Sequence, residues 1–334
     1  RPLVWLAALP LNGDRLHAAF LLTALSGAFC VFLAWDFTKR ASGGAIHALL
    51  TASLLGTSAA HLIFGSLVET YIFLAAVILV FFVLLLRNAP LFPLVLTGLL
   101  SFGITVSNFA QTVIALALVR RGAPAQWLKY GLIAGVLVFP LALLNNLIYP
   151  NSQPYFFAPS SLTVEAENTF SPSAARAMAV LRVMFLHSVV APDPLILEEE
   201  IPFFKVWMFK ADPLKVSEYE TGLGTLSAIA WIGFILYGGF LFLKGLQKRD
   251  NRFGFAFLLI LFFNFALHLR YGKDLFLYSA NWTYALVLFL SLAWKEVADK
   301  RGFQILLLLF LVLLAANNIR LINVMLVVSA WLIQ

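Results

Sequence analysis

Positive charge in this chain is confined to short islands between long apolar runs. Two such islands are Lys39–Arg40 and Arg120–Arg121, while the run Phe303–Ala316, beside Arg301, carries no charged residue. An apolar stretch long enough to cross hydrocarbon and bounded by Lys or Arg is typical of a membrane span with its basic end in the cytoplasm. The pattern therefore predicts a membrane-embedded chain, and it indicates which helix ends face outward.

Composition supports the same interpretation. Of the 334 residues, 62% are apolar and 12% are charged, and the mean hydropathy is +0.92, whereas a soluble domain carries about 25% charged residues. The net charge of +7 is an orientation signal, because the predicted inner segments hold the excess of Lys and Arg. No basic stripe with interleaved aromatic residues occurs, so nucleic acid is excluded as a partner.

Apolar runs of membrane-spanning length predict an all-α polytopic transmembrane bundle. Basic residues flank the inner end of each run, and the large polar segment falls outside. About eight full spans are expected, at residues 17–36, 45–63, 67–87, 128–149, 223–243, 253–270, 279–295 and 303–319.

The stretch between Arg87 and Arg120 does not fit this scheme of single crossings. Both of its flanks are basic, and its 32 or so residues are too few for two full crossings and a turn. We expect a short helix pair over 91–118, with helices at 91–103 and 107–118. Non-helical backbone at that depth must be covered by protein or by a wet cavity.

A polar segment of about 70 residues, 150–221, is the predicted extracytoplasmic loop. It divides the chain into N-terminal membrane helices (1–149), the loop itself and C-terminal membrane helices (222–334). Within the loop, Arg176–Val190 has helical periodicity and is predicted to lie along the membrane surface.

The first residues form a short apolar segment that ends in the turn Asn12-Gly13-Asp14. Because the chain begins at Arg1-Pro2 without Met, we expect that an N-terminal piece is missing. Cys30 is the sole cysteine, so no intrachain disulfide can form.

The first polar constellation lies where the second and third predicted spans meet, with His61 followed by Ser66–Tyr71. Glu69 at a membrane boundary is a functional-site hypothesis. The alternative is a capping box, in which Ser66 accepts from the Glu69 N–H and Glu69 reaches back to the Ser66 N–H. Polar residues at helical spacing also predict one stripe on the second span, formed by His47, Thr51, Ser58 and His61.

A second constellation covers 270–282 on the outer side. Arg270 and Lys273 are suited to a lipid phosphate, with Arg270 making a bidentate contact. The alternative is that both cations snorkel while Tyr278 and Trp282 form an aromatic belt.

Two weaker constellations remain. His187 and Asp193 are candidates for an acid–base or metal pair; the alternative is a helix-surface histidine and a Pro-flanked aspartate in a turn. Glu198–Glu200 is interpreted as a solvated face. Ser107, Asn108 and Gln111, at the turn of the helix pair, are suited to sugar hydroxyls or simply to the turn. The chain has no P-loop, dinucleotide glycine fingerprint, CxxC, HExxH or GxSxG motif.

Several short motifs together resemble a known family. They are Gly43–Ile46 at the start of the second span, Val68–Tyr71 at the start of the third, Leu99 to Asn108, and Tyr278–Trp282. The arrangement resembles the polytopic GT-C superfamily of glycosyltransferases, of the bacterial, polyprenyl-phosphate-sugar-dependent type.

The resemblance implies a transferase of the bacterial inner membrane that moves a sugar from a polyprenyl-phosphate carrier to a lipid, glycan or protein acceptor at the outer face. It implies a catalytic role for Glu69, with use of a divalent metal left open, and carrier-phosphate contacts for Arg270 and Lys273. Predicted substrate contacts are His61, Tyr71, Asn108 and Tyr278. We expect one departure from the family, because its acidic first outer loop would precede Arg1, and Asp14, in a turn-like setting, is the sole early outer acid of this sequence. Two alternatives stay open: that loop has been lost from this chain, or the protein is not an active member of the family.

Two other classes of function stay open. One is a non-enzymatic scaffold subunit of a larger membrane complex, whose Phe- and Leu-rich faces pack on neighbouring subunits. The other is a lipid or solute transporter, because interrupted helices such as the 91–118 pair occur in transporters. Against transport, no two halves of the chain look alike.

Overall fold

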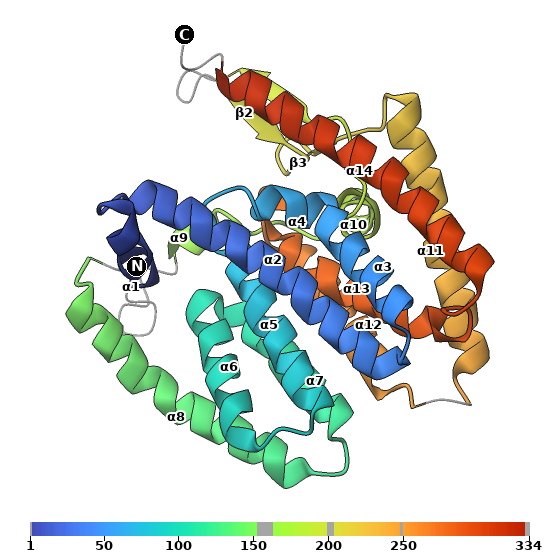
Figure 1. Cartoon of the computed structure of the whole chain (residues 1–334). Helices are drawn as coiled ribbons and strands as arrows, with labels where there is room; N and C mark the ends of the chain where they lie inside the picture. Colours follow the sequence, from blue (N-terminus) through green and yellow to red (C-terminus); the bar gives the residue numbers. More distant parts are fainter. Residues whose placement is uncertain (1, 152–162, 199–203, 248–249, 331–334) are drawn as a thin grey trace.

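The computed structural model describes residues 2–151, 163–198, 204–247 and 250–330, and the fold is helical apart from two small β-hairpins (Figure 1). The helices in chain order are α1 (Pro2–Ala8), α2 (Arg15–Ser42), α3 (Ala45–Thr57), α4 (Ala59–Phe64), α5 (Tyr71–Leu86), α6 (Leu91–Ile104), α7 (Phe109–Val119), α8 (Pro124–Ile148), α9 (Thr163–Ala166), α10 (Ala174–Arg182), α11 (Gly222–Gly245), α12 (Arg252–His268), α13 (Ala280–Ala293) and α14 (Arg301–Ala330). The strands are β1 (Leu195–Glu198), β2 (Phe204–Trp207), β3 (Phe209–Lys210) and β4 (Lys215–Val216).

Four helices of the described residues are long and apolar enough to cross a membrane: α2, α8, α11 and α14. They correspond to four of the predicted spans and suggest an integral membrane protein. The prediction of eight full spans is wrong, because the other four apolar runs form helices of 17 residues or fewer. The 16 residues of α5 extend about 24 Å, less than the roughly 30 Å of a hydrocarbon core.

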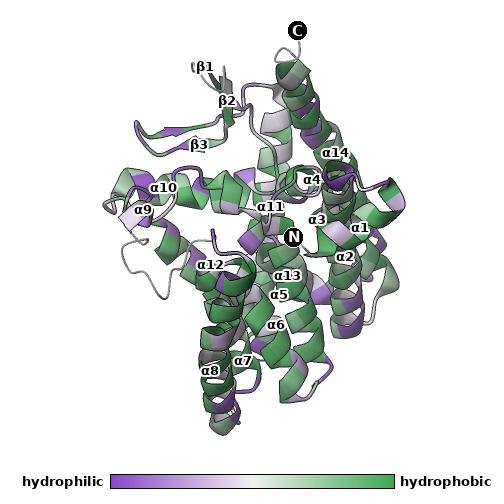
Figure 2. Cartoon of the chain, turned by 90° about the vertical axis from the view of Figure 1, so that its left-hand side faces the viewer, coloured by the Kyte–Doolittle hydropathy of each residue, from purple (hydrophilic) through white to green (hydrophobic). Residues whose placement is uncertain are grey.

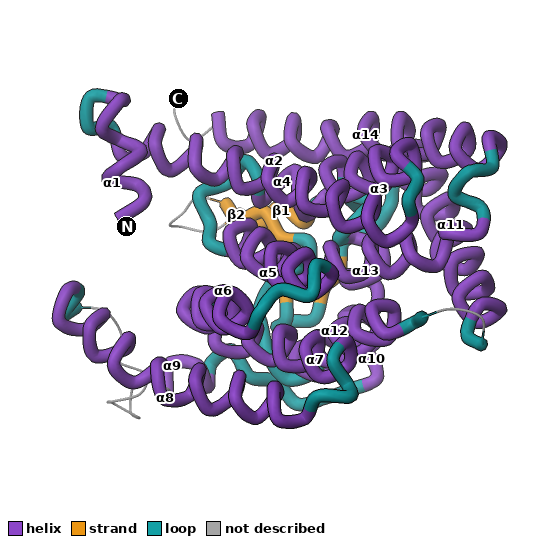
Figure 3. The backbone as a smooth tube through the Cα atoms, turned by 60° about the horizontal axis from the view of Figure 1, so that its bottom comes forward, coloured by secondary structure: helices purple, strands orange, loops and turns teal. Residues whose placement is uncertain are grey.

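The short apolar helices owe their hydrophobicity to burial inside the protein. All of α13 except Leu292 is buried, and α13 contacts α2, α3, α5, α11 and α12. Figure 3 shows α5 and α13 in the middle of the molecule, with α8 and α14 on opposite sides. Protein, rather than lipid, therefore covers these two helices.

The predicted span 45–63 is broken at Ser58, which separates α3 from α4. Neighbouring segments satisfy the backbone groups that the break frees. Asn318 of α14 donates to Thr57 O at 2.7 Å, and Ala59 N donates to Val189 O at 2.9 Å. These tertiary hydrogen bonds remove the usual cost of interrupting a buried helix.

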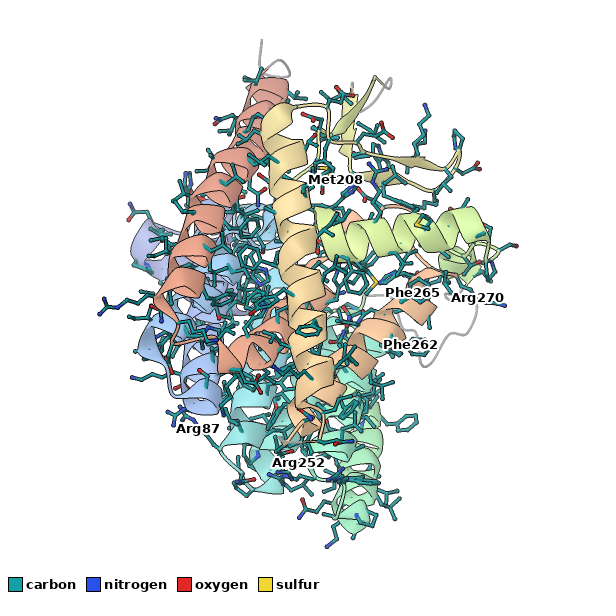
Figure 4. All side chains as sticks on the ribbon, turned by 90° about the vertical axis from the view of Figure 1, so that its right-hand side faces the viewer. Arg87, Met208, Arg252, Phe262, Phe265 and Arg270 are labelled. Carbon is teal, nitrogen blue, oxygen red and sulfur yellow. The ribbon has the colours of Figure 1, made fainter. Side chains whose placement is uncertain are left out.

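The helix pair expected between Arg87 and Arg120 is present as α6 and α7, joined at 105–108. Its two ends lie with the other basic segments. Asp36 accepts from Arg40 at 2.8 Å and from Arg87 at 2.9 Å, Arg252 donates to Val119 O at 3.1 Å, and Lys295 donates to Ala41 O at 2.9 Å. We call this the basic end of the bundle; Figure 4 shows Arg87 and Arg252 together there.

The opposite end carries the described residues 163–198 and 204–221 and is called the loop end. Here α10 continues as one π-helical turn, Val183–His187, and Figure 2 shows α10 lying crosswise to the long helices. The helix expected at Arg176–Val190 is thus present in part. Its Val180, Val183 and His187 are fully buried, so one face packs on protein rather than resting on a membrane surface.

The turn predicted at Asn12-Gly13-Asp14 is confirmed. Asn12 and Gly13 have φ of 54° and 84°, in the left-handed region that these two residue types tolerate best. The Asp14 carboxylate then caps α2 by accepting from the N–H groups of Leu16 and His17, both at 3.0 Å.

Candidate functional site: tyrosines and carboxylates at the loop end

The turn between α4 and α5 presents Glu69 at the loop end. The predicted capping box is wrong: the Ser66 hydroxyl donates to Leu62 O and Ile63 O, at 2.8 and 2.9 Å, and the Glu69 N–H donates to Leu67 O at 2.8 Å. The Glu69 side chain is exposed and makes no hydrogen bond or ion pair with any described residue. Its carboxylate is therefore available to a ligand.

Three tyrosines meet next to this turn. The rings of Tyr71, at the start of α5, and Tyr278, just before α13, have centroids 5.6 Å apart. Tyr271 follows α12, and its ring lies 5.9 Å from that of Tyr278. The other face of the cluster is closed by His268, whose ring lies 4.9 Å from Tyr278. The ring pairs are edge-to-face or tilted, as aromatic pairs prefer.

Three carboxylates surround these rings. The charges of Glu69 and Asp274 both act on Tyr71. Glu165 of α9 accepts a hydrogen bond from the Tyr271 hydroxyl at 2.7 Å, and Asp274 accepts from Phe276 N at 2.9 Å. We call the six residues the tyrosine–carboxylate site: Glu69, Tyr71, Glu165, Tyr271, Asp274 and Tyr278.

The carboxylates differ in their proton affinity. Burial raises the pKa of Asp274 to about 7, although two backbone N–H groups oppose the rise. Burial and the adjoining Glu165 raise the pKa of Tyr271. An acid that titrates near neutral pH is suited to proton transfer.

The turn 268–272 that holds Tyr271 is itself held by Arg176 of α10. This buried guanidinium donates to four carbonyl oxygens at 3.0–3.1 Å, those of His268, Leu269, Tyr271 and Gly272. Gly272 has φ of +105°, and a Cβ there would lie 2.9 Å from the Tyr278 ring. Glycine is therefore required both by the backbone and by the closeness of Tyr278.

Two of the predicted substrate residues, Tyr71 and Tyr278, thus lie together, with Glu69 beside them. His61 does not join them at the surface. It is 4% exposed, and its Nδ1 lies 3.4 Å from the Ser58 hydroxyl. The predicted stripe is buried as a whole, and His47 contacts Ser291 O of α13 at 3.0 Å.

Asn108 is also buried, at 2% exposure, between the helix pair and α13. It accepts from Gln111, which in turn donates to Asn281 O at 3.2 Å and accepts from Tyr284. In this structure its partners are protein groups, and the network ties α7 to α13.

Arg270 and Lys273 lie at the rim of the loop end. Arg270 is exposed and has no hydrogen bond or ion pair to a described residue through its side chain, and Figure 4 shows it at the side of the molecule, away from the basic end. Lys273 lies 3.8 Å from the Glu167 carboxylate. No contact joins either cation to Glu69, so their shared site stays a prediction.

His187 and Asp193, the weaker constellation of the loop, have different surroundings and do not pair with each other in the structure. His187 is fully buried with neither ring nitrogen hydrogen-bonded, and burial lowers its pKa to about 3. Asp193 instead pairs with Arg320 and accepts from Glu220 N at 2.9 Å. Glu199 and Glu200 lie outside the described residues.

Several residues of the site had no role assigned from the sequence. Tyr271 and Asp274 fall inside the 270–282 constellation, so their position was marked but their chemistry was not. Glu165 and Arg176 lie about 100 residues earlier in the chain, and nothing local indicates their contact with Tyr271.

Among the described residues, no group of three or more His, Cys, Asp or Glu side chains is arranged to hold a metal ion. No family model matches the chain, and neither a curated protein nor a solved structure is significantly similar to it. The family that the sequence motifs resemble is therefore not identified by these comparisons. What they and the fold establish together is a helical protein with four long apolar helices in its described part.

Proposed function

We propose that the chain is a membrane glycosyltransferase that takes a sugar from a polyprenyl-phosphate carrier at its loop end. The observation that supports the proposal is the tyrosine–carboxylate site. Three tyrosine rings lie within 6 Å of a neighbouring ring, beside an exposed Glu69 and an Asp274 whose pKa is near neutral. Aromatic faces suit a sugar ring, and carboxylates suit its hydroxyl groups.

In this proposal the lipid tail stays in the bilayer while the sugar phosphate reaches the loop end. Glu69 takes the proton of the acceptor hydroxyl as its oxygen attacks the anomeric carbon. The bond to the carrier phosphate breaks, and Arg270 and Lys273 bind the departing phosphate. The acceptor is a lipid, a glycan or a protein.

The test is transfer of a radiolabelled sugar from polyprenyl phosphate in membranes that contain the full chain. Glu69→Gln and Asp274→Asn keep the side-chain shape but remove the charge, and we expect each to lower transfer by about 10²–10⁴-fold, as for the loss of an acid or base. Glu220→Gln is the matched control, because Glu220 is an exposed loop carboxylate outside the site. Equal transfer by all three variants would exclude the proposed site.

Arg270→Ala tests the phosphate contact separately. We expect weaker use of the carrier, seen as a raised KM, because a charge-assisted contact to the phosphate is lost. A variant with wild-type KM would remove Arg270 from the proposal but would leave the role of Glu69 intact.

A scaffold subunit is the second candidate, and the surface of α8 favours it. In the most apolar stretch of α8 only 11% of the residues are buried inside the protein. The close helix neighbours of α8 are α6 and α7. Stoichiometric co-purification of other membrane proteins, together with no sugar transfer from any polyprenyl-phosphate donor, would favour this candidate over the enzyme.

A further inference from the structure

A cavity of about 1250 Å³ opens at the basic end of the bundle. It lies where α2, α5, α7, α12 and α13 end or begin, together with the connections 88–90 and 120–123. Its volume exceeds that of a usual small-molecule pocket, which is roughly 300–1,000 Å³. It is on the side of the bundle away from the tyrosine–carboxylate site, so nothing proposed above uses it.

Basic side chains dominate the charge of this cavity. Five Lys and Arg residues line it against two acids, Asp250 and Glu296. One of those acids is already taken, because Asp250 forms an ion pair with Arg252 at 2.6 Å. The five basic residues are Arg40, Arg120, Lys129, Arg252 and Lys295.

Three of these cations have no carboxylate partner among the described residues. Arg120 donates to Gln126 at 3.0 Å and to Ala89 O, and Lys295 donates to Ala41 O at 2.9 Å. Lys129 makes no hydrogen bond or ion pair to a described residue. Neutral oxygens orient Arg120 and Lys295 without neutralising them.

Burial acts against the charge of Arg120. It lowers the pKa of this guanidinium, and no nearby carboxylate offsets the loss of hydration. An anion in the cavity would supply the missing counter-charge. Phosphate oxygens accept from Arg in pairs and from Lys singly, so both kinds of cation suit the same anion.

The remaining wall of the cavity is apolar. Leu85, Leu86, Leu91, Phe242 and Phe253 line it beside the cations. A ligand that fits both parts has an anionic head and a hydrocarbon portion. Basic pockets between membrane helices are known to hold phospholipid head groups on the cytoplasmic side.

We propose that this cavity binds the phosphate head group of an anionic membrane lipid, with Arg120, Lys129 and Lys295 as its principal contacts. The acyl chains leave the cavity along its leucine and phenylalanine side chains. The proposal does not rest on sugar transfer, and it holds equally for a scaffold or a transporter.

The experiment is native mass spectrometry of the full chain in detergent, titrated with dioleoyl phosphatidylglycerol or, as the neutral lipid, dioleoyl phosphatidylcholine. We expect phosphatidylglycerol to bind more tightly. Arg120→Gln with Lys295→Gln should weaken that binding by about tenfold or more, since 1.4 kcal/mol corresponds to a factor of ten. Arg121→Gln is the matched control, because Arg121 is the exposed neighbour of Arg120 and does not line the cavity.

Lys129→Gln is a second variant that should fold normally, because Lys129 is exposed and makes no hydrogen bond or ion pair with a described residue. Weaker phosphatidylglycerol binding in Lys129→Gln and unchanged binding in Arg121→Gln would support the proposal. Equal loss in both, or no preference over phosphatidylcholine, would overturn it. Displacement of the bound lipid by millimolar inorganic phosphate would overturn the lipid assignment and indicate a site for free phosphate.

Discussion

Replacement of Arg176 by Met should destabilise the loop end more than the same replacement of Arg182, the other arginine of α10. Arg176 is 4% exposed, and it donates to four carbonyl oxygens at the end of α12 and in the turn that follows. Its guanidinium also lies 4.5 Å from the centre of the Phe170 ring. Methionine keeps much of the side-chain volume but removes all of these donors.

The magnitude follows from the carbonyl oxygens left behind. Tyr271 O keeps one other donor, His268 Nδ1 at 3.0 Å. Hydrogen bonds from charged groups contribute about 1.5–3 kcal/mol each and are not additive, so we expect a loss of about 3–5 kcal/mol for Arg176→Met. Arg176→Lys keeps the charge but not the planar fork, and about half of that loss is expected.

Arg182, at the last position of α10, is the matched control. It faces Glu218 at 3.8 Å, and its side chain is 32% exposed, so Arg182→Met should cost less than about 1 kcal/mol. The assay is thermal unfolding in detergent. Arg176→Met should lower the apparent Tm by about 4–7 °C, because an unfolding entropy of roughly 2.1 cal/mol/K per residue makes 1 kcal/mol equivalent to about 1.4 °C in a chain of 334 residues. An equal shift in the two Met variants would refute the role assigned to Arg176.

Three further predictions concern single side chains. Gly272→Ala should lower the free energy of unfolding by about 2 kcal/mol or more, because alanine is strained at positive φ and its Cβ would collide with the Tyr278 ring. Thermal unfolding followed by intrinsic fluorescence would detect the loss. The pKa of Asp274 is raised to about 7 in the folded state, so its contribution to the free energy of unfolding is fully present below about pH 4 and is lost as the pH rises through 7. The free energy of unfolding should fall by about 4 kcal/mol at most over this range. Asp274→Asn should flatten that part of the pH–stability curve, and an unchanged curve would contradict the burial of this acid. Asp36→Asn should lower the free energy of unfolding by about 1–2 kcal/mol, because Arg40 and Arg87 both lose their ion-pair partner. An unchanged Tm at low salt would contradict a stabilising role for these two ion pairs.

Sequence alone predicted several local features of the fold, although the capping box proposed at Ser66 was wrong. Asn12-Gly13-Asp14 was recognisable as a turn because Asn and Gly tolerate positive φ and Asp caps the following helix. The long helices α2 and α14 follow from uninterrupted apolar runs with basic flanks. Each of these signals is carried by neighbouring residues in the chain.

The number of spans was not predictable in the same way. An apolar run such as Tyr71–Leu86 has the same composition whether lipid or protein covers it, and here protein covers most of it. The break at Ser58 depends on Asn318, 260 residues later, whose amide replaces a helical hydrogen bond of Thr57. Hydropathy along the chain predicts neither the burial of an apolar run inside the protein nor a helix break that a distant side chain supports.

The candidate site shows the same division. Glu69, Tyr71 and Tyr278 were selected because polar groups at membrane boundaries stand out in an apolar sequence. Glu165 joined them only in the structure, through its hydrogen bond to Tyr271. From the sequence, Asn108 and His61 were equally suitable substrate contacts, yet both are buried within the protein. The sequence of an apolar helix does not show which of its faces is open to solvent and which packs on other helices.

The most direct test of the membrane arrangement is cysteine labelling from one side. Cys30 is the sole cysteine and is fully buried, so single cysteines can be placed at exposed positions in an otherwise unreactive chain. Thr70→Cys marks the loop end, and Lys300→Cys marks the basic end. With an impermeant maleimide on intact cells, Thr70→Cys should react at once and Lys300→Cys only after permeabilisation; reaction of both, or of Lys300→Cys alone, would contradict a bundle whose two ends face opposite sides of the membrane.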